Sequence, residues 1–201
     1  MTVRTIQDIN KSRVKVTLDN GFAFVIYKGE LYSYKIKEGE ELKEETYDEL
    51  MHMVLPKRAK LRAMNLLKVR PYTFKGLRDK LTEGGYPEEI IDIAIDYVSS
   101  FHYLDDLQYA RDYIYTYKER KNKQKLIQDL INKGVSKDLI EEAFESELST
   151  DETDYEGLQI KNILRKKGYY DREFSYEEIQ KLKASLYRKG FSSDKISEYL
   201  T

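Results

Sequence analysis

The chain has 201 residues, of which 40% are hydrophobic and 35% charged, and its net charge is −1. This composition is too apolar for a disordered chain, and the absence of cysteine excludes disulfides and thiolate metal sites. Residues 1–10 lack the apolar stretch of a signal peptide, and no run approaches the roughly 20 apolar residues that span a bilayer. We therefore expect a folded, monomeric, cytoplasmic protein with no membrane contact.

The charge is distributed unevenly along the chain. Residues 57–137 hold 17 basic and 11 acidic side chains, residues 138–160 hold nine acids and no base, and residues 161–201 hold ten bases and six acids. The near-neutral sum argues against a dedicated nucleic-acid binder, whereas the basic segments suit local contacts with an anionic partner. Two interpretations of the acidic block stay open. It is either a linker that repels nucleic acid or simply a helix and loop on the surface.

The N-terminal region is predicted to be β-rich. Apolar and polar residues alternate over 14–18 and again over 22–26, and Asp19-Asn20-Gly21 between them is typical of a hairpin turn. A second alternating stretch over 31–36 suggests a third strand. A short helix from about Thr46 to Met53 is expected to close this region.

From Pro56 onward the apolar residues follow helical spacing, and one phrase occurs three times. Each copy has two leucines four residues apart, then a glycine four residues after the second leucine. The copies are Leu77, Leu81 and Gly85; Leu126, Leu130 and Gly134; and Leu182, Leu186 and Gly190. The leucines share one helical face, and the glycine falls where a helix ends with a left-handed residue. Start signals for a further helix follow each glycine.

A preceding helix completes each copy, over about 59–69, 107–117 and 157–167. The predicted fold is therefore mainly α, with three tandem three-helix repeats in an elongated curved domain and a small N-terminal β-hairpin region. We divide the chain into an N-terminal region with a short helix (1–55) and helical repeats over 56–104, 105–149 and 150–201.

The sequence offers little for catalysis. The two histidines, His52 and His102, stand beside apolar residues and are predicted to face a core or a helix junction. Neither a phosphate-binding loop nor a dinucleotide-binding glycine motif occurs. Asp105 and Asp106 could pair for acid–base chemistry or Mg²⁺ binding, but they directly precede a predicted helix, which favours capping. We therefore predict no enzyme activity, metal or cofactor.

A basic stretch stands at the junction of two predicted helices. Five of the eight residues from Lys118 to Lys125 are Lys or Arg, and three tyrosines precede them. Such a cluster can hold phosphates while exposed rings stack on bases or pack on a partner. Cations at a helix C-terminus are also favoured by the helix dipole alone, and we weigh the two explanations equally.

The repeated phrase, together with Phe101-His-Tyr103-Leu104-Asp105-Asp106 and then Tyr109-Ala110, resembles the RecX family. The resemblance runs from about Lys57 to Leu200, and the Arg70-Pro-Tyr-Thr73 and Lys133-Gly134-Val135 segments add to it. Two departures are His102, where the family pattern has glycine, and an extension of the third repeat by residues 169–175. The N-terminal 55 residues lie outside the resemblance.

The resemblance implies a protein that binds the recombinase RecA, in the groove of its filament on DNA, and inhibits its ATPase and strand-exchange activities. The alternative function is direct DNA binding by the helical repeats, with single-stranded DNA as a candidate partner. Seven cations are the candidate partner- or DNA-binding residues: Arg62, Arg70, Lys118, Arg120, Lys121, Lys123 and Lys125.

Overall fold

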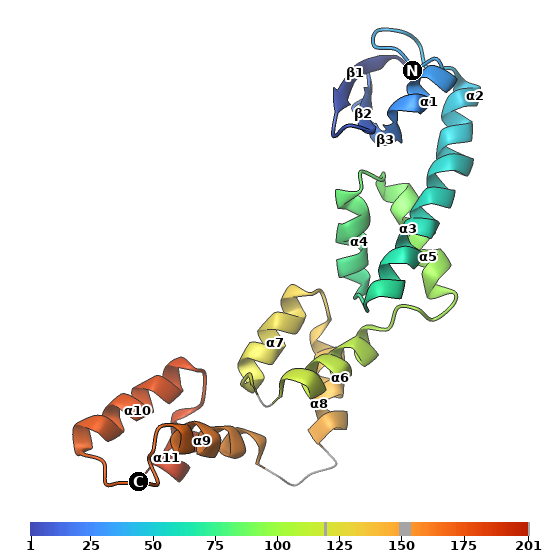
Figure 1. Cartoon of the computed structure of the whole chain (residues 1–201). Helices are drawn as coiled ribbons and strands as arrows, with labels where there is room; N and C mark the ends of the chain where they lie inside the picture. Colours follow the sequence, from blue (N-terminus) through green and yellow to red (C-terminus); the bar gives the residue numbers. More distant parts are fainter. Residues whose placement is uncertain (119, 149–153, 201) are drawn as a thin grey trace. The chain divides into compact units, whose positions relative to one another are not determined.

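A computed structural model describes residues 1–118, 120–148 and 154–200, with the side chains of residues 147, 148 and 155 left aside. The chain forms two compact units, Met1–Asp105 and Asp106–Thr201, and each is described by itself (Figure 1). Over the described residues, no helix combines the length and apolar character needed to cross a bilayer.

The first unit begins with a three-stranded antiparallel sheet in the order β1-β2-β3 (Figure 1). The strands are β1 (Val3–Asp8), β2 (Arg13–Leu18) and β3 (Ala23–Tyr27). The predicted hairpin is confirmed, because β2 pairs with β3 around a turn in which Gly21 has a φ of 84°. Alternate strand residues, from Val14 and Val16 to Phe24 and Ile26, are buried on one face.

The third strand predicted over residues 31–36 is wrong. Helix α1 (Lys28–Ser33) occupies part of this stretch, and the third strand is β1 at the start of the chain. The carboxylate of Glu30 accepts a hydrogen bond from the backbone N–H of Tyr27 at 2.8 Å, which stabilises the start of the helix. Alternating hydrophobicity over a few residues did not distinguish this short helix from a strand.

The predicted helix over 46–53 does not end before the first repeat. Helix α2 (Glu44–Glu49) runs through a π-helical turn (Leu50–Val54) directly into α3 (Leu55–Val69). Pro56 has no N–H to donate, and its ring crowds the carbonyl four residues earlier. A widened turn before Pro56 lets the helix continue through it.

The first repeat consists of α3, α4 (Phe74–Glu83) and α5 (Glu88–Ser99), and it shares one hydrophobic core with the sheet. The two parts are in close contact at Gly85. A Cβ atom on this glycine would lie 2.9 Å from the Cβ of Val25 in β3, and nearer still to its Cγ2. The predicted boundary at residue 55 stays a prediction, although side chains from both sides of it pack in this one core.

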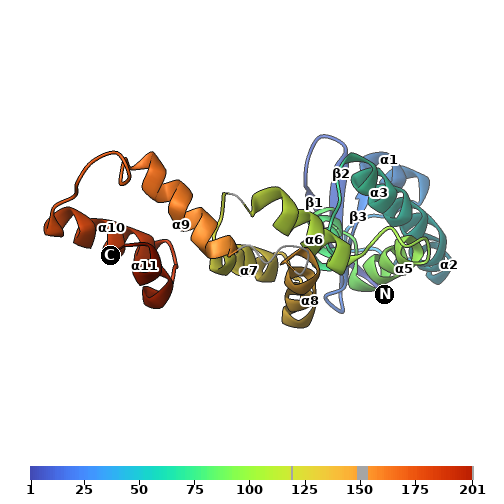
Figure 2. The same ribbon diagram turned by 90° about the horizontal axis from the view of Figure 1, so that it is seen from below.

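The second unit holds two more three-helix repeats. The second repeat is formed by α6 (Asp106–Tyr117), α7 (Lys123–Asn132) and α8 (Lys137–Leu148), which lie together in both views (Figures 1 and 2). The third is formed by α9 (Tyr155–Lys166), α10 (Tyr176–Arg188) and α11 (Ser193–Tyr199). Each repeat has its own buried cluster. The acidic block falls on α8 and the start of α9, and its residues 149–153 lie outside the described residues.

The repeated phrase has the predicted role in each repeat. Both of its leucines are buried in all three copies, and Gly85, Gly134 and Gly190 have φ values of 83°, 90° and 91°. The middle helix of each repeat begins at a polar N-cap, and the cap residues are Thr73, Asn122 and Ser175. The mainly α fold with three three-helix repeats and a small N-terminal sheet is confirmed.

Candidate functional site

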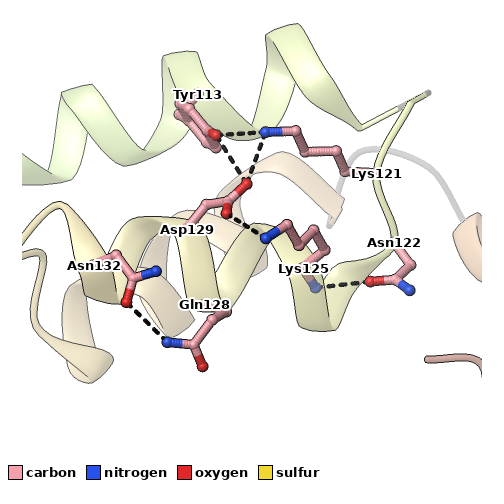
Figure 3. A network of polar contacts seen from close by, with 7 residues as sticks. All are labelled: Tyr113, Lys121, Asn122, Lys125, Gln128, Asp129 and Asn132. Carbon is pink, nitrogen blue, oxygen red and sulfur yellow. Dashed lines mark hydrogen bonds and ion pairs between the residues drawn. The ribbon is translucent and has the colours of Figure 1, made fainter. Parts of the chain in front are cut away.

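The basic stretch predicted at the junction of α6 and α7 contains a polar network (Figure 3). Lys121 donates hydrogen bonds to the carboxylate of Asp129 and to the hydroxyl of Tyr113, both at 2.7 Å. Lys125 forms an ion pair with the other oxygen of Asp129 at 3.0 Å. The ammonium of Lys121 also lies 4.4 Å from the ring centre of Tyr117. This network ties the turn after α6 to the middle of α7.

The network shifts the ionisation of its members. The hydrogen bond from Lys121 lowers the pKa of Asp129 to about 2, and those from Lys125 and Tyr113 act in the same direction. Reciprocally, the hydrogen bonds to Asp129 and Tyr113 raise the pKa of Lys121. The side chain of Asp129 is 15% exposed and that of Lys121 is 29% exposed. Lys121 is therefore a partly buried cation that is already paired within the protein.

The other predicted cations of the stretch lie in different surroundings. Arg120 is exposed. The ammonium of Lys118 lies 4.9 Å from the ring centre of Tyr115. Lys123 points elsewhere, because its ammonium lies 5.3 Å from the ring centre of Phe144 in α8. The depression around Lys123 also contains Glu141 and Glu145, so its charge is mixed.

Three of the predicted residues, Arg120, Lys121 and Lys125, line a groove of about 670 Å³ between the second and third repeats. The third repeat contributes four more cations, Lys166 and Lys167 at the end of α9 and Arg188 and Lys189 at the end of α10. The remaining lining residues are neutral, and they are Asn122, Gln159, Asn162, Ile163 and Phe191. The described lining of this groove thus contains seven cations and no acid. We call it the basic groove.

The helix dipoles that end at the basic groove offset only part of its positive charge. Helices α6, α9 and α10 end at the basic groove and α7 begins there. A helix end carries about half an elementary charge, negative at the C-terminus, so these four ends sum to about −1. Asp129 offsets one further charge through its pair with Lys121. Of the seven positive charges, roughly five remain in excess. This excess is better explained by binding of a polyanion than by helix ends that are merely solvated.

Arg62 and Arg70 belong to the first unit, which is described separately from the basic groove. Both are exposed. Arg62 lies on α3, whereas Arg70 follows the end of α3 and its guanidinium lies 4.6 Å from the ring centre of Tyr72. Their role in binding stays a prediction.

Both histidines are exposed, so the expectation that they face a core is wrong, although His102 does lie at the junction between α5 and α6. His52 lies on the solvent side of the π-helical turn, with 73% of its side chain exposed. His102 has a φ of 57°, the left-handed conformation that favours glycine. This conformation accounts for the glycine of the family pattern at this position. Asp106 is the first residue of α6 and Asp105 precedes it, as the capping interpretation predicts.

The four cations of the third repeat were not among the predicted site residues. A signal for them was present in the sequence, because each basic pair directly precedes a glycine that follows a helix. Lys166-Lys167 precedes Gly168 and Arg188-Lys189 precedes Gly190. What the sequence did not indicate is that both pairs line the same groove as Arg120.

The architecture defines a class of protein built from tandem three-helix domains. Three domain models of one family match the chain in order. The RecX first three-helix domain matches residues 59–97, the second matches 105–143 and the third matches 159–200. These matches cover more than half of the chain, and the chain belongs to the RecX family.

Relatives and solved structures agree with this assignment. A protein named "Regulatory protein RecX" from Caldanaerobacter subterraneus is 31% identical over 100% of this chain and 98% of its own length. One of the same name from Clostridium botulinum is 32% identical over 98% of this chain and 93% of its own. A structure titled "Crystal structure of regulatory protein RecX" has a TM-score of 0.62 at 23% identity, covering 99% of this chain and 98% of that one. RecX from Lactobacillus salivarius has a TM-score of 0.60 at 22% identity, over 72% of this chain and 94% of its own.

Proposed function

We propose that this protein binds RecA, or the RecA filament on DNA, and inhibits its ATPase and strand-exchange activities. Membership of the RecX family across all three helical domains is the observation that carries the proposal. Relatives of similar length are named regulatory proteins, which fits a role without chemistry of its own. The cation excess of the basic groove supports docking on an assembly that contains DNA.

The test is a titration of the purified protein into RecA reactions at fixed salt. We expect the DNA-dependent ATPase rate and the yield of strand exchange to fall together as the protein concentration rises. A variant with Lys166, Lys167, Arg188 and Lys189 replaced by glutamine tests the contribution of the basic groove and should inhibit less. Unchanged ATPase and strand exchange over the whole titration would overturn the proposal.

Direct DNA binding by the helical repeats is the second candidate, and the basic groove is the observation that favours it. The two functions differ in their response to competing DNA. A protein that acts by sequestering single strands loses its effect when naked single-stranded DNA is added in excess. A protein that binds the filament inhibits preformed filaments at a salt concentration that abolishes its binding to naked DNA.

A further inference from the structure

The turn between α6 and α7 is held by a buried side chain of the third repeat. The Gln159 side-chain amide donates hydrogen bonds to the backbone carbonyls of Lys118 and Lys121, the latter at 2.6 Å. Gln159 is 8% exposed, and a buried amide that loses its hydrogen-bond partners is left with the full cost of its desolvation. The contact therefore favours one arrangement of the two repeats.

A second residue of the third repeat, Gly190 near the other end of that repeat, packs against the same turn. A Cβ atom on Gly190 would lie 2.8 Å from both the Nδ2 of Asn122 and the Oε1 of Gln124. Asn122 is itself fixed, because its side chain accepts a hydrogen bond from the N–H of Lys125 at 2.7 Å. Gly190 has a φ of 91°, a left-handed conformation that favours glycine, and a side chain at this position would also have to displace these two amide groups.

Both contacts lie among the cations of the basic groove. Gln159, Asn162, Ile163 and Lys166 follow one another at helical spacing, so one face of α9 carries the amide contact and a groove lysine. Gly190 directly follows Arg188 and Lys189. The residues that join the repeats therefore also set where the cations of the third repeat stand relative to Arg120.

We infer that Gln159 is a positioning residue that joins the second and third repeats into one preformed anion-binding groove. The inference rests on the proposed function only for its ligand, the phosphates of DNA. A preformed groove binds without the cost of ordering its two walls. Loss of the Gln159 contacts should weaken binding even though every cation is retained.

Two spin labels measure the distance between the second and third repeats directly, with neither RecA nor DNA present. The chain has no cysteine, so single cysteines at the exposed positions Gln128 in α7 and Ala184 in α10 give a clean labelled pair. We expect a narrow distance distribution in the parent and a broad one in Gln159→Met, which keeps the size of the side chain and loses both donors. Gln180→Met, at an exposed position of α10, is the matched control and should resemble the parent.

Glutamate at the same position provides a second variant in case Gln159→Met folds poorly. Gln159→Glu also keeps the length of the side chain and turns an acceptor toward the two carbonyls, so it should broaden the distribution as well. Circular dichroism confirms that each variant is folded. A broad distribution in the parent, or distributions in both variants as narrow as the parent's, would overturn the inference.

Binding of a 20-nucleotide oligo-dT strand, measured by anisotropy across a salt titration, separates position from charge. We expect Gln159→Met to bind about 3–10-fold more weakly with the parent's salt slope, since the ligand can still draw the same cations together. The variant lacking the four third-repeat cations should have a shallower slope. Equal affinity of Gln159→Met and the parent would contradict the positioning role. Because these measurements omit RecA, their outcome is independent of the inhibition assay.

Discussion

Lys121 and Asp129 meet at 2.7 Å, and this ion pair joins the turn after α6 to the middle of α7. Asp129→Asn should destabilise the second repeat by roughly 1–2 kcal/mol at pH 7, because it removes the charged acceptor of two lysines. The measurement is the difference in free energy of unfolding between variant and parent from urea titrations.

The pH dependence of this difference has a definite sign. The pKa of Asp129 is lowered to about 2 in the folded protein, below its value of about 3.9 in an unfolded chain. The stabilisation is therefore complete above about pH 4 and is lost as the pH falls toward 2. Parent and Asp129→Asn should converge over this range. A difference that persists unchanged at pH 2, or is absent at pH 7, would contradict the role assigned to the pair.

Gly134→Val should destabilise the second repeat by well over 1 kcal/mol. Gly134 has a φ of 90°, and a β-branched residue is strained in this conformation. Gly134→Asn is the control and should cost less, since asparagine tolerates the left-handed region. Melting temperatures followed by circular dichroism test the order parent, Asn, Val. Equal melting temperatures would show that the turn adapts without strain.

Gly85→Ala should loosen the contact between the first repeat and the sheet. The added Cβ would lie 2.9 Å from the Cβ of Val25, and the φ of Gly85 is also left-handed. Val25→Ala removes the methyl groups that a Cβ at position 85 would meet, so the double variant should be less destabilised than the sum of the two single variants. Simple additivity in urea titrations would mean that backbone strain alone accounts for the cost.

Neutralising the third-repeat cations should weaken inhibition of RecA strand exchange more than neutralising Lys121 and Lys125. Asp129 already pairs with both of those lysines, whereas the four third-repeat cations lie exposed along the basic groove. The concentration for half-inhibition should rise several-fold at low salt. The difference from the parent should shrink as the salt concentration rises, because salt screens the attraction that the parent's cations provide.

A matched control replaces four exposed lysines outside the basic groove, Lys11, Lys15, Lys57 and Lys181. It should inhibit like the parent with a similar melting temperature, because the charge change is the same. An equal loss of inhibition in the control would show that net charge matters and the basic groove does not.

A variant in which Lys121 is also neutralised should, in contrast, have a lower melting temperature, because it loses the hydrogen bonds of Lys121 to Asp129 and Tyr113.

The purified protein should hydrolyse neither ATP nor DNA. The sequence lacks a phosphate-binding loop, and the described residues contain no group of three or more acidic or histidine side chains that could hold a metal. Phosphate release and nuclease assays with Mg²⁺ test this. Turnover that co-elutes with the protein and persists in independent preparations would overturn it.

The helical repeats were predictable because their signal is redundant. Leu126 and Leu130 share a helical face, Gly134 ends the helix, and the same phrase returns twice. The N-terminal region offered no such repetition. Its residues 31–36 alternate like a strand, yet Glu30 satisfies the N–H of Tyr27 and a helix forms instead. The alternation of apolar and polar residues does not reveal a hydrogen bond of this kind, which decides between a strand and a helix.

The candidate site was predictable only in part, because it is assembled from two repeats. The cluster from Lys118 to Lys125 is visible as a run, but its partner cations stand more than 40 residues further along the chain. In the sequence, nothing distinguishes Lys121 from Arg120 as a candidate binding residue. Only the position of Asp129 separates an internally paired lysine from an exposed arginine.

Gly85 and Gly190 occupy the same place in the repeated phrase, yet each meets a different neighbour. Gly85 faces Val25 of the sheet, and Gly190 faces Asn122 and Gln124 of the second repeat. The repeats are therefore alike in sequence but not interchangeable. A chain with the first and third repeats exchanged would keep every helix and lose the fit at both junctions. The order of the three repeats in the chain thus depends on the few side chains that pack against each of these glycines.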